Sequence, residues 1–269
     1  MLFRKNIKYS QKINLSTWRK TAFGTWSMTG DCQVYCLQTI DVSKCLELLD
    51  EHSSLSMTHL AGAALGRMVQ MNPVINRVIR LGQYYQREDI SVFFQVATDK
   101  EGKDLSGYTV KDADTKTAVQ IAKEMNKNVK KIKKGDDLNY KKVKETMAHV
   151  PTILMPPIIK TLGTMMYTFN LWNKVLGPPQ DSFGSAMITN IGSLGFQTGF
   201  APLVPYSRVP LVLAMGKVYK KAVVENDEVV IKPVIDFCWT SDHRLIDGVT
   251  GAKMSQDFEK LILSPQQLI

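Results

Sequence analysis

The segment TSDHRLIDGVTG, Thr240 to Gly251, places His243, Asp247 and Gly248 within six residues. A neutral imidazole can remove a proton from a thiol or a hydroxyl at neutral pH when a hydrogen bond on its other ring nitrogen fixes the tautomer. We expect a turn that projects His243 into a pocket, with Asp247 folded back beneath it and Gly248 allowing a bend that a side chain would block. No second histidine lies nearby, so the spacing favours a general base over a metal ligand.

The elements on either side of this motif are predicted by apolar periodicity. The run VVIKPVIDFCWTS, residues 229–241, predicts a long strand, and GVTGAKMSQDFEKLIL, residues 248–263, predicts an amphipathic helix. His243 then lies where a strand ends in a loop, which is the usual place for functional side chains held by a rigid scaffold.

The remaining elements occur in mixed order, which indicates an α/β or α+β fold with a single domain. Residues 82–88, GQYYQRE, are expected to form a hairpin connection or a short exposed excursion. The other predicted strands cover residues 31–43, 76–81, 89–99, 184–191 and 210–224, with a turn at 225–228, and the other predicted helices cover 41–52, 56–71 and 114–132.

The composition is that of an ordinary folded protein. Of 269 residues, 44% are hydrophobic and 22% are charged, and the basic N-terminus lacks the apolar run of a signal peptide. The scattered positions of Cys32, Cys36, Cys45 and Cys238 predict reduced, buried thiols in a cytoplasmic protein.

The net charge of +9 could favour an anionic partner, but much of it comes from the lysine-rich residues 125–145. Apolar residues recur within that segment, so we expect two helices with solvated lysine faces. No recognition helix or aromatic RNA-binding motif accompanies the lysines, and we expect no nucleic-acid partner.

An apolar segment, residues 149–179, does not fit the scheme of strands and helices. Pro156 and Pro157 are expected to break a helix, and only 13 residues separate Lys160 from Lys174, which is too short for a membrane span. We predict a buried or partner-facing helix. The alternatives are a peripheral membrane contact within 150–176, and a lid over a lipophilic substrate; the aromatic residues for the membrane contact are Tyr167, Phe169 and Trp172.

The H-x-x-x-D-G pattern HRLIDG, preceded by Ser241 and Asp242, resembles the C-terminal signature of the acyltransferase cores of 2-oxo acid dehydrogenase complexes and of the related chloramphenicol acetyltransferases. The resemblance extends upstream in the same order. It includes GSAMITNIGSLGF (184–196), PLVPYSRVPLVLAMGKV (202–218) and the Asn-Pro region with its following strand (72–105), while INLSTWRKTAF (13–23) is closer to the chloramphenicol acetyltransferase entry segment.

This resemblance implies a chloramphenicol acetyltransferase-like two-layer sandwich of a mixed sheet and helices, formed by one catalytic domain over 1–269 with an apolar insertion at about 149–179. It implies acyl transfer between a CoA thioester and a thiol, dihydrolipoyl-like, or hydroxyl acceptor. His243 would be the base, and Thr189 would stabilise the tetrahedral oxyanion. Asp247 would hold the loop through an ion pair with Arg19 or Lys20. Asn190 would orient the neighbouring backbone or pack at the strand end.

The same resemblance implies acyl-CoA as substrate, a lipoyl group on a partner protein and no metal. It also implies a homotrimer, or a multiple of trimers, whose active site takes its histidine from one subunit and its hydroxyl from the next. The sequence departs from the family in the apolar insertion, in EGKDLSGYTV (101–110) and in showing no lipoyl module ahead of the core. Two alternatives therefore stay open: a non-catalytic trimeric assembly protein, and a membrane-associated binding protein that keeps the fold.

Overall fold

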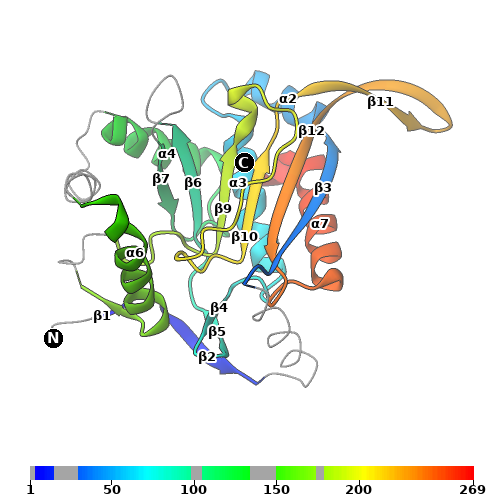
Figure 1. The fold of residues 1–269 in the computed structure, drawn as a ribbon. Helices are drawn as coiled ribbons and strands as arrows, with labels where there is room; N and C mark the ends of the chain where they lie inside the picture. Colours follow the sequence, from blue (N-terminus) through cyan, green and yellow to red (C-terminus); the bar gives the residue numbers. More distant parts are fainter. Residues whose placement is uncertain (1–3, 15–29, 98–104, 134–149, 174–178) are drawn as a thin grey trace.

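The computed structural model describes residues 4–14, 30–97, 105–133, 150–173 and 179–269. In this part of the chain, a large mixed sheet carries helices on one face, and a smaller sheet lies below one end of it (Figure 1). The predicted α/β architecture, with a mixed sheet and helices, is confirmed.

The large sheet is seven-stranded within the described ranges and has the order β11-β12-β10-β9-β6-β7, with β3 on the other edge of β12. The neighbours of β9 are parallel to it, and the other pairs are antiparallel. Its strands are β3 (Gln33–Asp41), β6 (Val92–Ala97), β7 (Leu105–Val110), β9 (Ala186–Asn190), β10 (Leu211–Met215), β11 (Tyr219–Glu225) and β12 (Glu228–Asp242).

The predicted strand at 210–224 is in fact two strands. Met215 pairs with Phe237 and Tyr219 pairs with Val234, so one residue is gained between β10 and β11 along the edge of β12. Beyond this bulge β11 and the first half of β12 form a hairpin that extends away from the rest of the chain (Figure 1).

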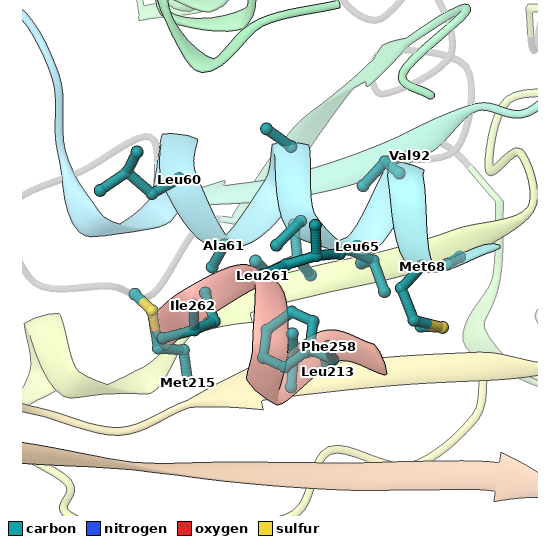
Figure 2. Close-up of a cluster of buried hydrophobic side chains, with 14 of the residues drawn as sticks. Leu60, Ala61, Leu65, Met68, Val92, Leu213, Met215, Phe258, Leu261 and Ile262 are labelled. Carbon is teal, nitrogen blue, oxygen red and sulfur yellow. The ribbon is translucent and has the colours of Figure 1, made fainter. Parts of the chain in front are cut away.

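Four helices pack their buried side chains against the large sheet to form the main core of the described structure: α2 (Ser43–Glu51), α3 (Met57–Met71), α4 (Ala118–Lys133) and α7 (Gly248–Leu263). Side chains of α3 and α7 meet over β10, as Figure 2 shows for Leu65, Phe258 and Leu213. All four helices were predicted, because each has an apolar stripe that faces the sheet. The lysine-rich segment is described only as far as Lys133.

The smaller sheet has the order β2-β5-β4 and consists of β2 (Tyr9–Ile13), β4 (Arg77–Arg80) and β5 (Gln83–Arg87). The expectation of a hairpin connection or exposed excursion at 82–88 was wrong, because β5 is the central strand of this sheet. It pairs on both sides, and Tyr84 is only 1% exposed.

The insertion forms a short helical unit beside the smaller sheet. It consists of the 3-10 turn η1 (Thr152–Leu154), helix α6 (Met155–Gly163), the π-helical turn η2 (Thr164–Thr168) and β8 (Leu171–Trp172), which pairs with β1 (Arg4–Lys5). Pro156 and Pro157 occupy the first turn of α6. The prolines therefore begin this helix and do not break it, because a first-turn residue needs no intrahelical N–H bond.

The aromatic residues proposed for a membrane contact do not share one exposed surface. Tyr167 is 2% exposed and lies in a small cluster with Ile7, Val78 and Met166, against which Trp172 also packs. Phe169 is exposed. The predicted contact through all three rings is therefore wrong for Tyr167. Among the described residues, no helix is both long and apolar enough to cross a membrane.

The thiols are not uniformly buried. Cys45 and Cys238 are buried, Cys32 is half-buried and Cys36 is exposed on β3. The prediction of buried thiols was wrong for Cys36, because β3 lies at the edge of the described sheet.

Candidate functional site

His243 lies directly after β12, at the start of the turn that leads to α7. Its backbone N–H donates to the carbonyl of Cys32 at 2.8 Å, and its ring Nδ1 lies 3.0 Å from the carbonyl oxygen of Ile246. A carbonyl can only accept, so Nδ1 carries the proton in this bond. In the neutral ring Nε2 is then the basic nitrogen, which is the tautomer that a general base requires.

The turn that carries His243 is closed by backbone bonds. The carbonyl of Asp242 accepts N–H bonds from Leu245 at 3.0 Å and from Ile246 at 2.9 Å. These bonds hold the backbone N–H of Ile246, and the carbonyl of the same residue accepts the bond from the imidazole. The bonds within the turn that orient the imidazole thus lie inside five residues of chain, 242–246.

Asp242 and Arg244, on either side of His243, form a two-pronged ion pair. Nε of Arg244 donates to Oδ1 of Asp242 at 2.9 Å and Nη2 donates to Oδ2 at 2.6 Å, while the Arg244 backbone N–H also reaches Oδ1. The hydrogen bonds that Arg244 donates to the Asp242 carboxylate raise the pKa of the guanidinium. Burial, with a contribution from the charge of Asp242, raises the pKa of the Cys32 thiol to about 11. The sequence pattern around His243 did not indicate a role for this pair.

Asp247 caps the helix that follows the turn. Its carboxylate accepts the backbone N–H of Thr250 at 2.9 Å, and an acidic side chain suits the N-terminus of a helix. The described part of the chain shows no steric need for glycine at position 248. Gly248 is the first residue of α7 and lacks a positive φ, and a Cβ added to it would meet no described atom within 4 Å.

Thr189 and Asn190 end strand β9. Thr189 is half-buried and pairs with Ala214 of β10. The side chain of Asn190 accepts the backbone N–H of Ser193 at 3.1 Å and donates to Thr58 Oγ1 at 3.0 Å. Asn190 therefore caps the 3-10 turn η4 (Ile191–Leu194) and holds the local backbone.

The chain after η4 returns across the sheet at very close range. A Cβ on Gly216 would lie 1.8 Å from the carbonyl oxygen of Gln197, so only glycine fits there. Asp236 of β12, which is 3% exposed, accepts hydroxyl bonds from Thr39, Thr198 and Tyr219 at 2.6 to 3.0 Å. Asp236 therefore ties the loop after Thr189 to three strands of the sheet.

Within one chain the structure does not bring His243 and Thr189 together. Thr189 lies level with Ala214, whose partner on β12 is Cys238, and His243 follows Cys238 by five residues. At about 3.3 Å per residue this offset is about 16 Å along the sheet, and about two strand spacings separate the two residues across it.

The other predicted or considered residues have different positions. Arg19 and Lys20, the predicted partners of Asp247, lie outside the described residues, as does His149. His59 serves a helix cap, because its Nδ1 accepts the backbone N–H of Ser56. In the described part of the chain, no group of three or more His, Cys, Asp or Glu side chains is arranged to hold a metal ion.

Comparison with known proteins places sequence similarity in the C-terminal part of the chain. Residues 172–269 match the family of 2-oxoacid dehydrogenases acyltransferase (catalytic domain). The dihydrolipoyllysine-residue acetyltransferase component of the pyruvate dehydrogenase complex of Bacillus subtilis (strain 168) is 35% identical over 94 residues, which are 35% of this chain and 21% of that protein. The match thus spans about a fifth of that relative's length. The resemblance predicted from the motifs is confirmed for this part of the chain.

Solved structures extend the similarity of fold to nearly the whole chain. A probable dihydrolipoamide acetyltransferase from Listeria monocytogenes has a TM-score of 0.64 at 15% identity, and the match covers 95% of each chain. A chloramphenicol acetyltransferase has a TM-score of 0.54 at 13% identity, over 94% of this chain and 100% of that one. The predicted chloramphenicol acetyltransferase-like fold is confirmed.

Proposed function

We propose that this protein is a CoA-dependent acyltransferase that moves an acyl group between a CoA thioester and a thiol acceptor of the dihydrolipoyl type, or a hydroxyl acceptor. The bond from His243 Nδ1 to the Ile246 carbonyl carries the proposal, because it selects the tautomer of a general base at a strand end. Two further findings support it: the matched residues 172–269 contain both His243 and Thr189, and the fold is shared with acetyltransferases.

In this reaction Nε2 of His243 removes the proton from the acceptor thiol as its sulfur attacks the thioester carbonyl carbon. A tetrahedral intermediate forms, whose oxyanion requires a donor that is already in place. The carbon–sulfur bond to CoA then breaks, and the departing CoA thiolate takes the proton back from His243. The acyl group has moved, and no covalent bond to the enzyme has formed.

The oxyanion donor in this proposal is the hydroxyl of Thr189 from a neighbouring copy of the chain. The offset between Thr189 and His243 within one chain supports a site shared between subunits, as in a homotrimer or a multiple of trimers. Asp247 would support the half of the site that carries His243, through its helix cap and an ion pair with Arg19 or Lys20. Asn190 would support the half that carries Thr189, through its cap on η4.

The acceptor in this proposal includes a lipoyl group on a separate partner protein, as the names of the relatives suggest. We propose further that residues 1–269 act as a single catalytic domain with the insertion packed on its smaller sheet. The insertion then belongs to the enzyme and does not form a separate module.

The test is transfer from a panel of acyl-CoAs to dihydrolipoamide and to small hydroxyl acceptors, followed by mass spectrometry of the acylated acceptor. His243→Ala should lower kcat by about 10²- to 10⁴-fold, which is the usual contribution of a general base. The matched control is His52→Ala, at the end of α2, which should leave kcat unchanged. If wild-type protein consumes no acyl-CoA above the level of His243→Ala, the proposal is wrong and a non-catalytic assembly role replaces it.

A further inference from the structure

Strand β5 presents two adjacent tyrosines to opposite sides of the smaller sheet. Neighbouring residues of a strand point to opposite faces. Tyr84 pairs with Ile13 and Ile79, and all three pack into the main core. Tyr85 pairs with Val78 and packs against the small cluster that contains Met166 and Tyr167 of the insertion. One strand thus contacts both the main core and the insertion.

On the face of the smaller sheet that carries Tyr84, the tyrosine hydroxyl contacts the turn that carries His243. The Tyr84 hydroxyl donates to the carbonyl of Arg244, which is 160 residues away in sequence, and the Tyr84 ring is fully buried. Arg244 is the residue after His243, so this bond holds a peptide inside the turn. The same turn presents the Ile246 carbonyl to the imidazole.

The Tyr85 side is held by the insertion. Nε of Arg80, on β4, donates to the carbonyl of Thr168 at 2.9 Å. The guanidinium carbon Cζ of Arg80 lies 5.2 Å from the ring centroids of both Tyr9 and Tyr85. Met166 of η2 is 3% exposed in the same cluster. The insertion therefore braces β4 and β5 on the face opposite Tyr84.

A buried ion pair fixes the end of the same strand. Nη1 of Arg87 lies 2.6 Å from Oδ2 of Asp181, and the Arg87 side chain is 2% exposed. Asp181 also donates its backbone N–H to Asn6 Oδ1 at 2.9 Å. The N-terminal segment, β5 and the chain just after the insertion are thereby joined at one point.

We propose that Tyr84 is a positioning residue for His243, and that the insertion supports catalysis by bracing β5. The insertion would then act through Tyr84 on the turn from Asp242 to Ile246 and would need no contact with substrate. This inference rests on the proposed function, since it assigns Tyr84 a role in presenting the same base.

The first test is Tyr84→Phe, which removes the hydroxyl and keeps the ring. We expect kcat to fall about tenfold or more with KM for acyl-CoA unchanged, because a misplaced base affects the chemical step and leaves substrate binding intact. The matched control is Tyr108→Phe, which removes the hydroxyl bond from Tyr108 to Glu124 on the far side of the core and should leave kcat unchanged. Equal kcat values in the two variants would overturn the proposal.

The second test addresses the insertion. Met166→Ala opens a cavity behind β5, whereas Met125→Ala opens one beside α4 by the same chemical change. Only Met166→Ala should lower kcat. If the effect passes through Tyr84, the double variant of Tyr84→Phe and Met166→Ala should have the kcat of Tyr84→Phe alone. Additive losses, or equal losses in the two methionine variants, would contradict a path through β5.

A third measurement separates this inference from the proposed function, because it needs no turnover. We expect the Nδ1 proton of His243 to be detectable by NMR, because a hydrogen bond to the Ile246 carbonyl slows its exchange, and His243→Ala identifies its signal. Its exchange with solvent should be faster in Tyr84→Phe than in Tyr108→Phe. Faster exchange in a protein without transferase activity would leave the positioning role intact and refute only the proposed function. Unchanged exchange would refute the positioning role.

Discussion

Thr189 and His243 lie at opposite ends of one sheet. Thr189 is level with Cys238, and four more residues of β12 follow Cys238 before the chain reaches His243. No rotamer of either side chain can close an offset of about 16 Å, since a side chain reaches only a few ångströms from the backbone. In the proposed reaction, base and oxyanion donor must therefore come from two copies of the chain.

This geometry predicts complementation between two inactive variants. His243→Ala and Thr189→Ala should each be nearly inactive alone, the latter by about 10²- to 10³-fold, because an oxyanion donor is lost. Co-expressed with different affinity tags and purified through both, mixed trimers should contain one intact site in three and show about a third of wild-type activity.

The control for complementation is a mixture of His243→Ala with a chain that carries both substitutions. Such trimers contain no intact histidine and should stay inactive. If the first mixture is also inactive, although its mixed trimers are verified by mass, the two residues do not share a site between subunits.

The sequence located the parts of the site that are local in the chain. His243, its preceding strand and the helix after it follow from apolar periodicity and a short motif. Asp247 also acts within its own turn, although as a helix cap. Tyr84 could not be found in this way, because its bond to Arg244 exists only once the smaller sheet has docked against the end of β12.

The errors in the predicted fold have a similar origin. Residues 82–88 contain two glutamines among their tyrosines and begin with glycine, so they lack the apolar alternation of a buried strand. Pairing with both β2 and β4 makes them a central strand all the same. Gly248 was assigned a steric role from its place in the motif, but the space around a glycine depends on the packing of distant segments.

Breaking the fork between Asp242 and Arg244 should lower stability. Arg244→Ala leaves a carboxylate whose side chain is 9% exposed without its charged partner, and we expect the free energy of unfolding to fall by about 2 kcal/mol. Arg244→Lys should lower the free energy of unfolding by a smaller amount, because an ammonium keeps the charge but cannot donate two parallel bonds. Urea denaturation measures both changes.

The control for the fork is Lys116→Ala, which breaks an ion pair with Glu124 at a more exposed site. That change should cost less than about 0.5 kcal/mol, since exposed pairs contribute little. A similar cost at both positions would mean that the fork has no special role in holding the turn.

Two glycine substitutions should have opposite outcomes. Gly216→Ala places a Cβ 1.8 Å from the Gln197 carbonyl, so the loop after Thr189 must shift, at a cost of about 1 to 3 kcal/mol. Gly248→Ala should leave stability unchanged or raise it by a few tenths of a kcal/mol, because alanine favours a helix. Thermal unfolding of the two variants checks this, and a large loss in Gly248→Ala would restore the steric role first assigned to that residue.

The carboxylate of Asp236 should give the protein a pH-dependent component of stability. Burial alone would raise its pKa, but hydrogen bonds from Thr198, Thr39 and Tyr219 outweigh burial and lower the pKa below the ordinary value of 3.8. A carboxyl whose pKa is lower in the folded state stabilises that state above pH 3.8, and this contribution is lost as the pH falls through the lowered value.

Asp236→Asn removes the titrating group and should be less stable than wild type at pH 5 to 7, because an amide accepts fewer hydroxyl bonds. The difference in urea midpoint between the two proteins should then shrink below pH 3.8. A difference that stays constant from pH 7 to pH 3 would show that the three hydroxyl bonds do not favour the ionised carboxylate.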